Sequence, residues 1–358
     1  MKNSIIIRPK HILLFIVDFS LAAYIYYVNF VLFGNDFWRC IYLSVMTFTF
    51  TWLCWALYFE LRDFWQFRWH RVDDLQVKIK LVQIPILWPN IDQNFDINSK
   101  NENKSNKNPT LYGEILHRDG TPPKSPLVIF SHGFSDDCIY TRHITIPIVL
   151  SGYDVLTFDS RGSGKSRKAG RTNQFVEITR DLKDVIKYVK KDSILGDRPI
   201  YLVGISLGSL ASIKQGLTDD SVEKIIAVAA MSNYRDNIPQ SPITFKKNWW
   251  LWLRYTFFGV KMNPLDAINY ELSPLLQLAE LRKNFVEDAD WIDFTSKKLF
   301  LIHAKNDKII SFESFLENRD VAKLISNNEN WEILNSGGHN FLQYELPLVG
   351  TIIAMMQR

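Results

Sequence analysis

IYLVGISLG, residues 200–208, joins a run of apolar residues to a Gly-x-Ser-x-Gly pattern centred on Ser206. A continuous run of this kind is typical of a strand buried on both faces of a parallel sheet, and an apolar helical stretch follows it. Glycines two positions before and after the serine leave room for a sharp turn from strand to helix. We therefore expect Ser206 to project its hydroxyl above a sheet, at the start of a helix.

Further predicted strands occur on both sides of this segment, and several of them are continuous apolar runs. Leu75–Trp88 instead alternates and is interpreted as a strand or hairpin arm. The others are Leu111–His117, Leu127–His132, Asp154–Asp159, Ile225–Ala230, Leu299–Ala304 and Trp331–Leu334. Helical stretches such as Phe175–Lys191 and Phe341–Gln357 lie between them. Alternating strands and helices predict an α/β domain with a mostly parallel, doubly wound sheet, whose site lies at the carboxyl ends of the strands.

The chemistry expected at Ser206 requires a base and an acid. A serine hydroxyl becomes a nucleophile when a histidine removes its proton and a carboxylate orients that histidine. In this kind of site both partners follow the serine in sequence. His303 lies inside a predicted strand, where a packed histidine is expected, whereas His339 lies in a glycine-rich loop (SGGHN). The predicted triad is Ser206, Asp307 and His339, with Asp236 as the alternative acid.

Two backbone N–H groups are expected to bind the oxyanion of a tetrahedral intermediate. One belongs to Leu207, because the residue after the nucleophile opens the helix. The other belongs to Phe134, since Gly133 permits a turn at the end of the strand before it. We interpret His132 as structural.

On these residues the chain resembles the α/β-hydrolase superfamily, in particular anchored hydrolases similar to monoglyceride lipases and serine aminopeptidases. The matching pieces appear in the family's order from about Leu111 to the C-terminus: His132-Gly133-Phe134, Asp159–Ser166 (DSRGSGKS), the turn around Ser206, Asp307 and His339. The resemblance implies hydrolysis through an acyl-enzyme, with no metal or organic cofactor. The chain lacks the further glycines of an HGGG-type oxyanion loop, so that loop is not carried over.

Composition excludes several other classes of protein. The formal charge of +4 is too small and too evenly spread for a nucleic-acid footprint. Three cysteines are too few for a disulfide framework and match no zinc or haem spacing. Gly164-Lys165-Ser166 ends like a P-loop, but the spacing requires a glycine where Asp159 stands. We therefore expect neither nucleic acid nor nucleotide as a partner.

The N-terminal residues are far more apolar and aromatic than the remainder. Runs at residues 12–33 and 40–59 each approach the roughly 20 residues that cross a bilayer as a helix, and a short turn joins them. We predict a transmembrane hairpin as an anchor comprising residues 1–71, with Asp18 at an interface or facing a partner. A cleaved signal peptide is the alternative, although the first run exceeds the usual apolar region and no small-x-small cleavage site follows.

Basic residues predict the orientation of this hairpin. Lys2, Arg8 and Lys10 precede the first run, Arg62, Arg68 and Arg71 follow the second, and Arg39 lies in the turn. By the positive-inside rule both ends, and the catalytic domain with them, face the cytoplasm.

Two segments of the remaining domain, residues 72–358, differ from the α/β pattern. Residues 90–109 are rich in Asn, Lys, Ser and Asp and predict a flexible solvated loop. Residues 232–296 are too long for a plain crossover and predict a helical cap. Within the cap, residues 246–258 carry three tryptophans between basic ends. That segment either lines an acyl pocket, contacts the bilayer or packs on its own domain.

These observations predict a membrane-anchored serine hydrolase that cleaves a carboxylic ester or thioester with an apolar acyl group. Its expected partners are the lipid bilayer and a lipidic or acylated substrate. An amide-cleaving serine peptidase of the same fold has the same triad and is one alternative. A non-catalytic membrane scaffold is another.

Overall fold

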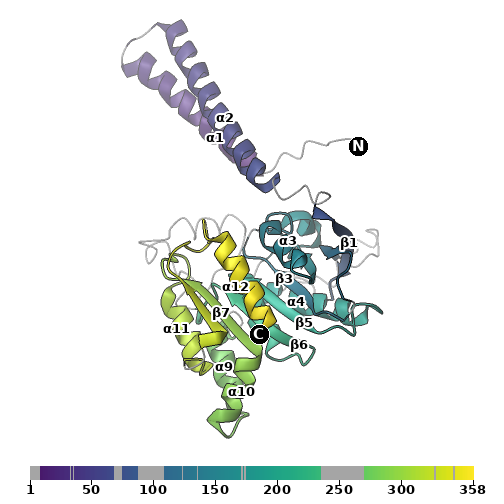
Figure 1. Cartoon of the computed structure of the whole chain (residues 1–358). Coiled ribbons are helices and arrows are strands. Elements are labelled where there is room, and N and C mark those ends of the chain that lie inside the picture. The colour runs from purple at the N-terminus through teal and green to yellow at the C-terminus, as the bar shows by residue number, and fades with distance from the viewer. Residues whose placement is uncertain are drawn as a thin grey trace, which may run out of the picture. The chain divides into compact units, whose positions relative to one another are not determined.

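The computed structural model of the chain (Figure 1) describes residues 9–32, 34, 36–67, 75–87, 109–122, 124–134, 136–170, 172, 175–234, 270–325, 328–341 and 343–358. The chain divides into two compact units, Met1–His70 and Arg71–Arg358.

The second unit is built on an eight-stranded sheet with the order β1-β2-β4-β3-β5-β6-β7-β8. The strands are β1 (Val77–Pro85), β2 (Thr110–Arg118), β3 (Leu127–Ser131), β4 (Asp154–Phe158), β5 (Ile200–Ile205), β6 (Val222–Val228), β7 (Leu299–Ala304) and β8 (Trp331–Leu334). All eight strands predicted from the sequence form. β2 pairs antiparallel with both β1 and β4, and the pairs from β4 to β8 are parallel. The predicted mostly parallel α/β sheet is therefore confirmed.

Helices in the second unit connect the strands. They are α3 (Arg142–Leu150), η3 (Gly164–Ala169), α4 (Phe175–Lys191), α5 (Leu207–Gly216), α9 (Pro274–Arg282), α10 (Asp288–Lys298), α11 (Phe312–Val321), η4 (Asn328–Asn330) and α12 (Glu345–Gln357). α3 and α12 contact each other and pack on the sheet, and Figure 1 shows α12 in front of the strands. A second connected layer runs through α4, α5, α9 and α11. Helices therefore cover the sheet, as its apolar strands require.

Helix α4 illustrates why the sequence folds in this way. Its buried residues Phe175, Ile178, Leu182, Val185 and Val189 recur every three or four positions and form one apolar face. Burying an aliphatic or aromatic side chain of this size contributes about 1.5–3 kcal/mol relative to leaving it exposed. That contribution holds the helix against a sheet whose central strand β5 has five successive buried residues.

Several predicted features fall wholly or partly outside the described residues. Residues 90–108 of the predicted loop, cap residues 235–269, the aromatic segment 246–258 and Asp236 are among them. At the end of the predicted cap, α10 packs against β6 and β7 like a crossover helix of the sheet.

The first unit contains α1 (Pro9–Tyr27), the short π-helix η1 (Val28–Leu32) and α2 (Phe37–Phe67), and α1 packs against α2. A helical hairpin therefore forms where the sequence predicts one, and Asp18 is buried within the chain. Among the described residues, however, no helix combines the length and the apolar character needed to cross a membrane. The transmembrane spans predicted at residues 12–33 and 40–59 are not supported.

Candidate active site

Ser206 lies at the junction of β5 and α5, as predicted. Its backbone has φ 55° and ψ −115°, a conformation that L-residues rarely adopt. The turn is held by a hydrogen bond from the Ser206 N–H to the Val228 carbonyl and by the N–H groups of Ser209 and Leu210, which donate to the Ser206 carbonyl. The strain at one residue is offset by these contacts, and the serine precedes the first turn of α5.

The two glycines of the motif are required because backbones meet at this turn. A Cβ atom on Gly204 would lie 2.3 Å from the Gly208 carbonyl oxygen. A Cβ atom on Gly208 would lie 2.0 Å from the carbonyl oxygen of Ser131, at the end of β3. Neither position has room for a side chain, so the start of α5 packs directly against the end of β3.

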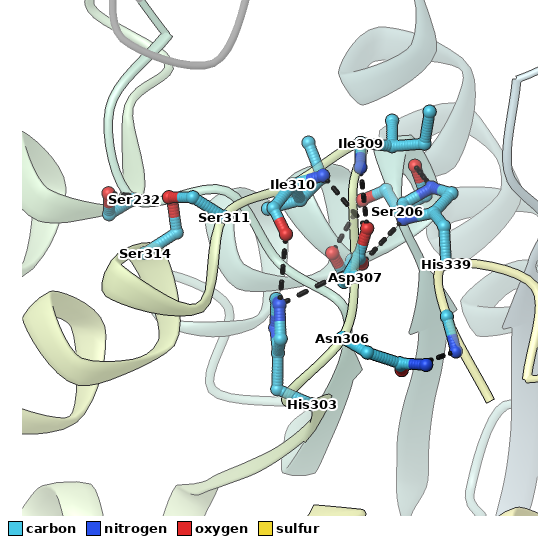
Figure 2. Close-up of polar contacts among 12 residues, drawn as sticks. Ser206, Ser232, His303, Asn306, Asp307, Ile309, Ile310, Ser311, Ser314 and His339 are labelled. Carbon is cyan, nitrogen blue, oxygen red and sulfur yellow. Dashed lines mark hydrogen bonds and ion pairs between the residues drawn. The ribbon is translucent and has the colours of Figure 1, made fainter. Parts of the chain in front are cut away.

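His339 bridges Ser206 and Asp307. Its Nδ1 lies 2.8 Å from Asp307 Oδ2, and its Nε2 lies 2.9 Å from Ser206 Oγ. Because a carboxylate only accepts, Nδ1 carries the proton and Nε2 is left to accept the serine proton. Figure 2 shows the three side chains converging from loops that follow different strands. The structure thus brings together the three residues predicted as a triad, which span more than a hundred positions of sequence.

The other oxygen of Asp307 is held by the backbone. Its Oδ1 accepts hydrogen bonds from the N–H groups of Ile309 and Ile310, at 2.8 and 3.0 Å. The Asp307 side chain is fully buried. These contacts leave Oδ2 directed at the histidine.

Asn306 was not singled out from the sequence, yet it links the acid loop to the histidine loop. Its Oδ1 accepts the Gly338 N–H at 2.8 Å, and its Nδ2 donates to Ser336 Oγ at 3.2 Å. Both partners lie just before His339 in the sequence. The only signal in the sequence is an asparagine next to the predicted acid, which does not reveal a partner 32 residues away.

His303 is buried in β7, as expected. Its Nε2 donates to the Ile310 carbonyl at 3.2 Å and lies 3.7 Å from Asp307 Oδ2. Burial lowers the pKa of His303 below its ordinary value of 6.5, although the neighbouring carboxylate of Asp307 acts in the opposite direction. His303 is therefore a neutral neighbour of the acid and not a base for Ser206.

The backbone segments that carry the predicted oxyanion donors both approach Ser206. Leu207 is the first residue of α5, so its N–H has no acceptor within the helix. A Cβ atom on Gly133 would lie 3.5 Å from Ser206 Cβ, which brings the backbone before Phe134 against the nucleophile.

Asp159, which stands where a P-loop would need a glycine, accepts hydrogen bonds from two loops. Asp159 accepts the N–H of Cys138 through Oδ1 and the N–H of Lys165 through Oδ2, both at 2.7 Å. Asp159 thus ties two loops to the end of β4. Burial, with Asp159 and Glu114 nearby, raises the pKa of the Cys138 thiol, so this cysteine is a poor nucleophile.

An open pocket of about 360 Å³ lies between the acid loop and the histidine loop. His339 and Ile309 line it, together with polar groups that include Asn306 and Gln343. It offers room for part of a substrate next to the catalytic candidate His339.

Comparison with known proteins agrees with this arrangement. Residues 122–288 match the model of the family described as serine aminopeptidase, S33. The match covers Ser206 and ends before Asp307. The chain has the α/β-hydrolase fold.

Solved structures resemble the chain in fold. An esterase from Pyrococcus furiosus aligns with a TM-score of 0.51 at 19% identity, covering 80% of this chain and 95% of the esterase. The acylaminoacyl peptidase of Pyrococcus horikoshii aligns with a TM-score of 0.53 at 18% identity, covering 79% of this chain and 41% of the peptidase. No curated protein matches the chain in sequence. The hydrolase is thus of the serine type, with both esterases and peptidases among proteins of similar fold.

Proposed function

We propose that this hydrolase cleaves a carboxylic ester or thioester with an apolar acyl group, through an acyl-enzyme on Ser206. One observation carries the proposal: an unbroken hydrogen-bonded path runs from Ser206 Oγ through His339 to Asp307, with both distances below 3 Å. Such a path is what activation of a serine hydroxyl requires.

The chemistry follows from the positions of the atoms. Ser206 Oγ attacks the acyl carbon while His339 Nε2 takes its proton, and Asp307 stabilises the imidazolium that forms. The N–H groups of Leu207 and Phe134 bind the oxyanion. His339 then protonates the leaving alcohol or thiol, the carbon–oxygen or carbon–sulfur bond breaks, and an acyl ester on Ser206 remains. Water, deprotonated by His339, releases the acid and restores the serine.

The N-terminal unit supports a lipidic substrate. Its described helices expose large apolar and aromatic side chains, among them Trp38, Phe50, Tyr24, Phe19 and Leu53, each more than half exposed. A surface of this composition favours the apolar and headgroup regions of a bilayer. We propose that the hairpin attaches the enzyme to a lipid membrane, with the catalytic domain on the cytoplasmic side.

A fluorophosphonate probe tests the catalytic proposal. Wild-type protein should be labelled covalently, and Ser206→Ala should abolish the labelling. Ser209→Ala is the matched control. Ser209 lies in the first turn of α5, and its hydroxyl donates to the Ser206 carbonyl and does not face His339. Absence of labelling on wild type, or labelling that survives Ser206→Ala, would favour the non-catalytic scaffold.

Nitrophenyl esters with acetyl, octanoyl and dodecanoyl groups test the acyl preference. We expect kcat/KM to rise with chain length, because each buried methylene contributes about 0.8 kcal/mol. A flat or falling series contradicts the apolar acyl site.

Flotation with phospholipid vesicles tests the membrane proposal. Replacing Trp38, Phe50 and Leu53 together by Asp should release the protein from vesicles. Val286→Asp is the control, because Val286 is 90% exposed but lies in the hydrolase domain. Equal flotation of all three proteins would contradict attachment through the hairpin. Labelling of a cysteine introduced within residues 90–108, from outside intact cells, would contradict the cytoplasmic assignment.

Amide cleavage is the second candidate, favoured by the match to the serine aminopeptidase family. The same acyl group presented as an ester and as an anilide separates the two reactions. If the enzyme is an esterase, kcat/KM for the ester should exceed kcat/KM for the anilide by more than the difference in their intrinsic reactivity. Comparable kcat/KM for the two substrates would favour the peptidase.

A further inference from the structure

A basic segment follows β4 and has no part in the chemistry proposed above. Between Asp159 and Glu177 the sequence has five basic residues and no acidic one. The two flanking acids are buried, at 2% and 0% exposure. Within η3, the side chains of Lys165, Arg167 and Lys168 are exposed. Cations placed so close together give this surface a positive potential that attracts anions.

The three cations differ in their contacts. Lys165 Nζ donates to Tyr112 Oη at 2.8 Å and lies 4.1 Å from the centre of that ring. Arg167 and Lys168, in the last turn of η3, form no hydrogen bond or ion pair with any residue that the structure describes. Their side chains are therefore the part of the segment that is available to an external anion.

The neighbouring loop after β3 does not cancel this charge. Its acids are Asp136 and Asp137, and both are half-buried. Asp137 lies close to the start of η3, since a Cβ atom on Gly164 would lie 2.9 Å from Asp137 Cβ. Its Oδ1 accepts the Tyr140 N–H at 2.8 Å. Two partly buried carboxylates thus stand against three exposed cations, and the surface keeps a net positive charge.

Hydrogen bonds to buried groups fix the backbone of the basic segment. The Lys165 N–H donates to Asp159 Oδ2 at 2.7 Å. The Ser166 hydroxyl, which is buried, accepts the Tyr112 N–H at 2.8 Å. Because residue 166 points inward, the exposed cations on either side of it are presented on a fixed turn. Groups fixed in this way lose less conformational freedom when they bind a partner.

The segment leaves the sheet at the edge that carries the active site. β3, β4 and β5 are parallel, so their carboxyl ends lie at one edge. The Ser160 N–H, after β4, donates to His132 Nε2 at 3.1 Å, and His132 Nδ1 lies 2.7 Å from the Gly133 carbonyl oxygen. A Cβ atom on Gly133 would lie 3.5 Å from Ser206 Cβ. A short chain of contacts thus joins the loop that leads to η3 to the nucleophile.

We propose that Arg167 and Lys168, with Lys165 beside them, bind the anionic headgroups of a lipid bilayer and turn the active-site edge of the sheet toward the membrane surface. A bilayer is favoured because the N-terminal unit of the same chain exposes large apolar side chains. Exposed cations bind a continuous negative surface of headgroups without the need for a shaped pocket. The inference rests on the proposed function, in which the substrate is lipidic.

Two double variants of the full chain test the proposal. Arg167→Gln with Lys168→Gln removes the two exposed charges of the segment. Lys191→Gln with Lys297→Gln is the control, because both lysines are exposed and lie in the last turns of α4 and α10. Those helices lead to the amino ends of β5 and β7, at the opposite edge of the sheet. The same charge is therefore removed from two different edges.

Binding is measured with vesicles of phosphatidylcholine alone and of phosphatidylcholine mixed with phosphatidylglycerol. We expect the Arg167, Lys168 double variant to bind the anionic vesicles about thirtyfold more weakly than wild type. That factor is about 2 kcal/mol, the sum for two cations near an anionic surface. The control should stay within about threefold of wild type, because charges beyond a Debye length are screened.

Three further readouts separate the segment from the hairpin and the active site. Wild-type affinity for anionic vesicles should fall as the salt concentration rises from about 0.1 M to about 1 M, because the Debye length shrinks from about 10 Å to about 3 Å. Binding to phosphatidylcholine alone should be the same in all three proteins. Their kcat/KM for a soluble nitrophenyl ester should also agree, whereas hydrolysis of an acyl ester embedded in anionic vesicles should fall with binding in the Arg167, Lys168 double variant.

Equal losses in the two double variants would overturn the inference, since the charge of the whole protein would then govern binding. Wild-type affinity that is the same for both kinds of vesicle would overturn it as well. Release of wild type from anionic vesicles by soluble glycerophosphate, at constant ionic strength, would assign the cations to a free phosphate ester. Failure of the proposed function is a different result, in which wild type neither hydrolyses the soluble ester nor is labelled at Ser206.

Discussion

The nucleophile turn, Gly204–Gly208, and the histidine loop, Ser336–Phe341, carry two parts of one site but are held by different forces. In the turn, backbone touches backbone, and a single added methyl group at Gly208 would lie 2.0 Å from a carbonyl oxygen. In the loop, a Cβ atom at Gly338 would meet nothing within 4 Å, and the exposed side chain of Asn306 holds the chain by hydrogen bonds.

This difference predicts whether a substitution in each region should lower the stability of the fold or the activity of the site. Two backbones in contact cannot make room for an extra atom, so substitutions in the turn should lower stability. Water can replace hydrogen bonds made by an exposed side chain, so substitutions around the loop should leave the fold intact and disturb the position of His339. The following changes test that division, beginning with the largest expected effect.

Asp307→Asn should lower kcat by about 10⁴, the loss found when a triad aspartate of a serine protease is changed in this way. Asn Oδ1 can still accept the N–H groups of Ile309 and Ile310, which leaves Nδ2 facing His339. His339 Nδ1 must then accept, its proton moves to Nε2, and the ring can no longer take the proton of Ser206. Steady-state kinetics and chemical denaturation should show a large loss of kcat with a small change in unfolding free energy.

Asp293→Asn is the control for this change, because Asp293 is an exposed carboxylate paired with Lys297 on α10. It should have wild-type kcat. A loss of less than tenfold in Asp307→Asn would show that another group supplies the acid.

Gly208→Ala should lower the free energy of unfolding by about 3 kcal/mol or more, at the upper end of overpacking effects. The methyl group would overlap the Ser131 carbonyl, and neither backbone can move without disturbing β3 or α5. Denaturant unfolding, or loss of soluble protein, measures the effect. Gly350→Ala is the matched control, because nothing lies within 4 Å of that position in α12. It should stabilise the protein by up to about 1 kcal/mol. Similar effects at the two glycines would show that the close approach of Gly208 to the Ser131 carbonyl does not limit stability.

Asn306→Ala should lower kcat about tenfold while the unfolding free energy changes little, since the hydrogen bonds that it removes contribute about 1 kcal/mol each. The pH profile of kcat should also flatten or shift, because the position of His339 against Asp307 changes. Asn306→Asp keeps an acceptor for the Gly338 N–H and should restore part of the activity. Lys305→Ala, at the neighbouring exposed position, should behave as wild type. If Asn306→Ala and Lys305→Ala are equally active, the histidine loop does not depend on Asn306.

His303 should make a smaller contribution that depends on pH. Its pKa in the folded protein is below the ordinary 6.5, so the unfolded chain binds the proton first as the pH falls. Stability from the neutral ring is therefore complete above about pH 6.5 and is lost as the pH falls through that value toward the folded pKa. His303→Gln can keep a donor to the Ile310 carbonyl and does not titrate.

Thermal unfolding of both proteins between about pH 7.5 and about pH 5 measures this contribution. The wild-type protein should lose more stability over that range than His303→Gln. His143, whose pKa burial also lowers, is present in both proteins and cancels in the difference. Parallel pH profiles would show that His303 does not titrate differently in the folded and unfolded states.

Much of the fold could be predicted from the sequence because its signals are local. The central strands of the sheet are short apolar runs, and α4 begins and ends where its spacing predicts. The Ser206 turn follows from two glycines and a serine at fixed spacing. The hairpin shows the limit of the same reasoning, since its two helices form as expected, whereas no helix among the described residues is long and apolar enough to cross a membrane.

The sequence by itself determined the α/β alternation, the position of Ser206 and the order in which an acid and a histidine follow it. Only the tertiary structure decided that His339 lies between Ser206 and Asp307, that Asn306 reaches Gly338, and that the two nitrogens of His132 bind backbone groups from two loops. The physical reason is the range of each interaction. Periodicity and turn chemistry act over a few residues, whereas these contacts join loops that become neighbours only when the strands assemble in the order of the sheet.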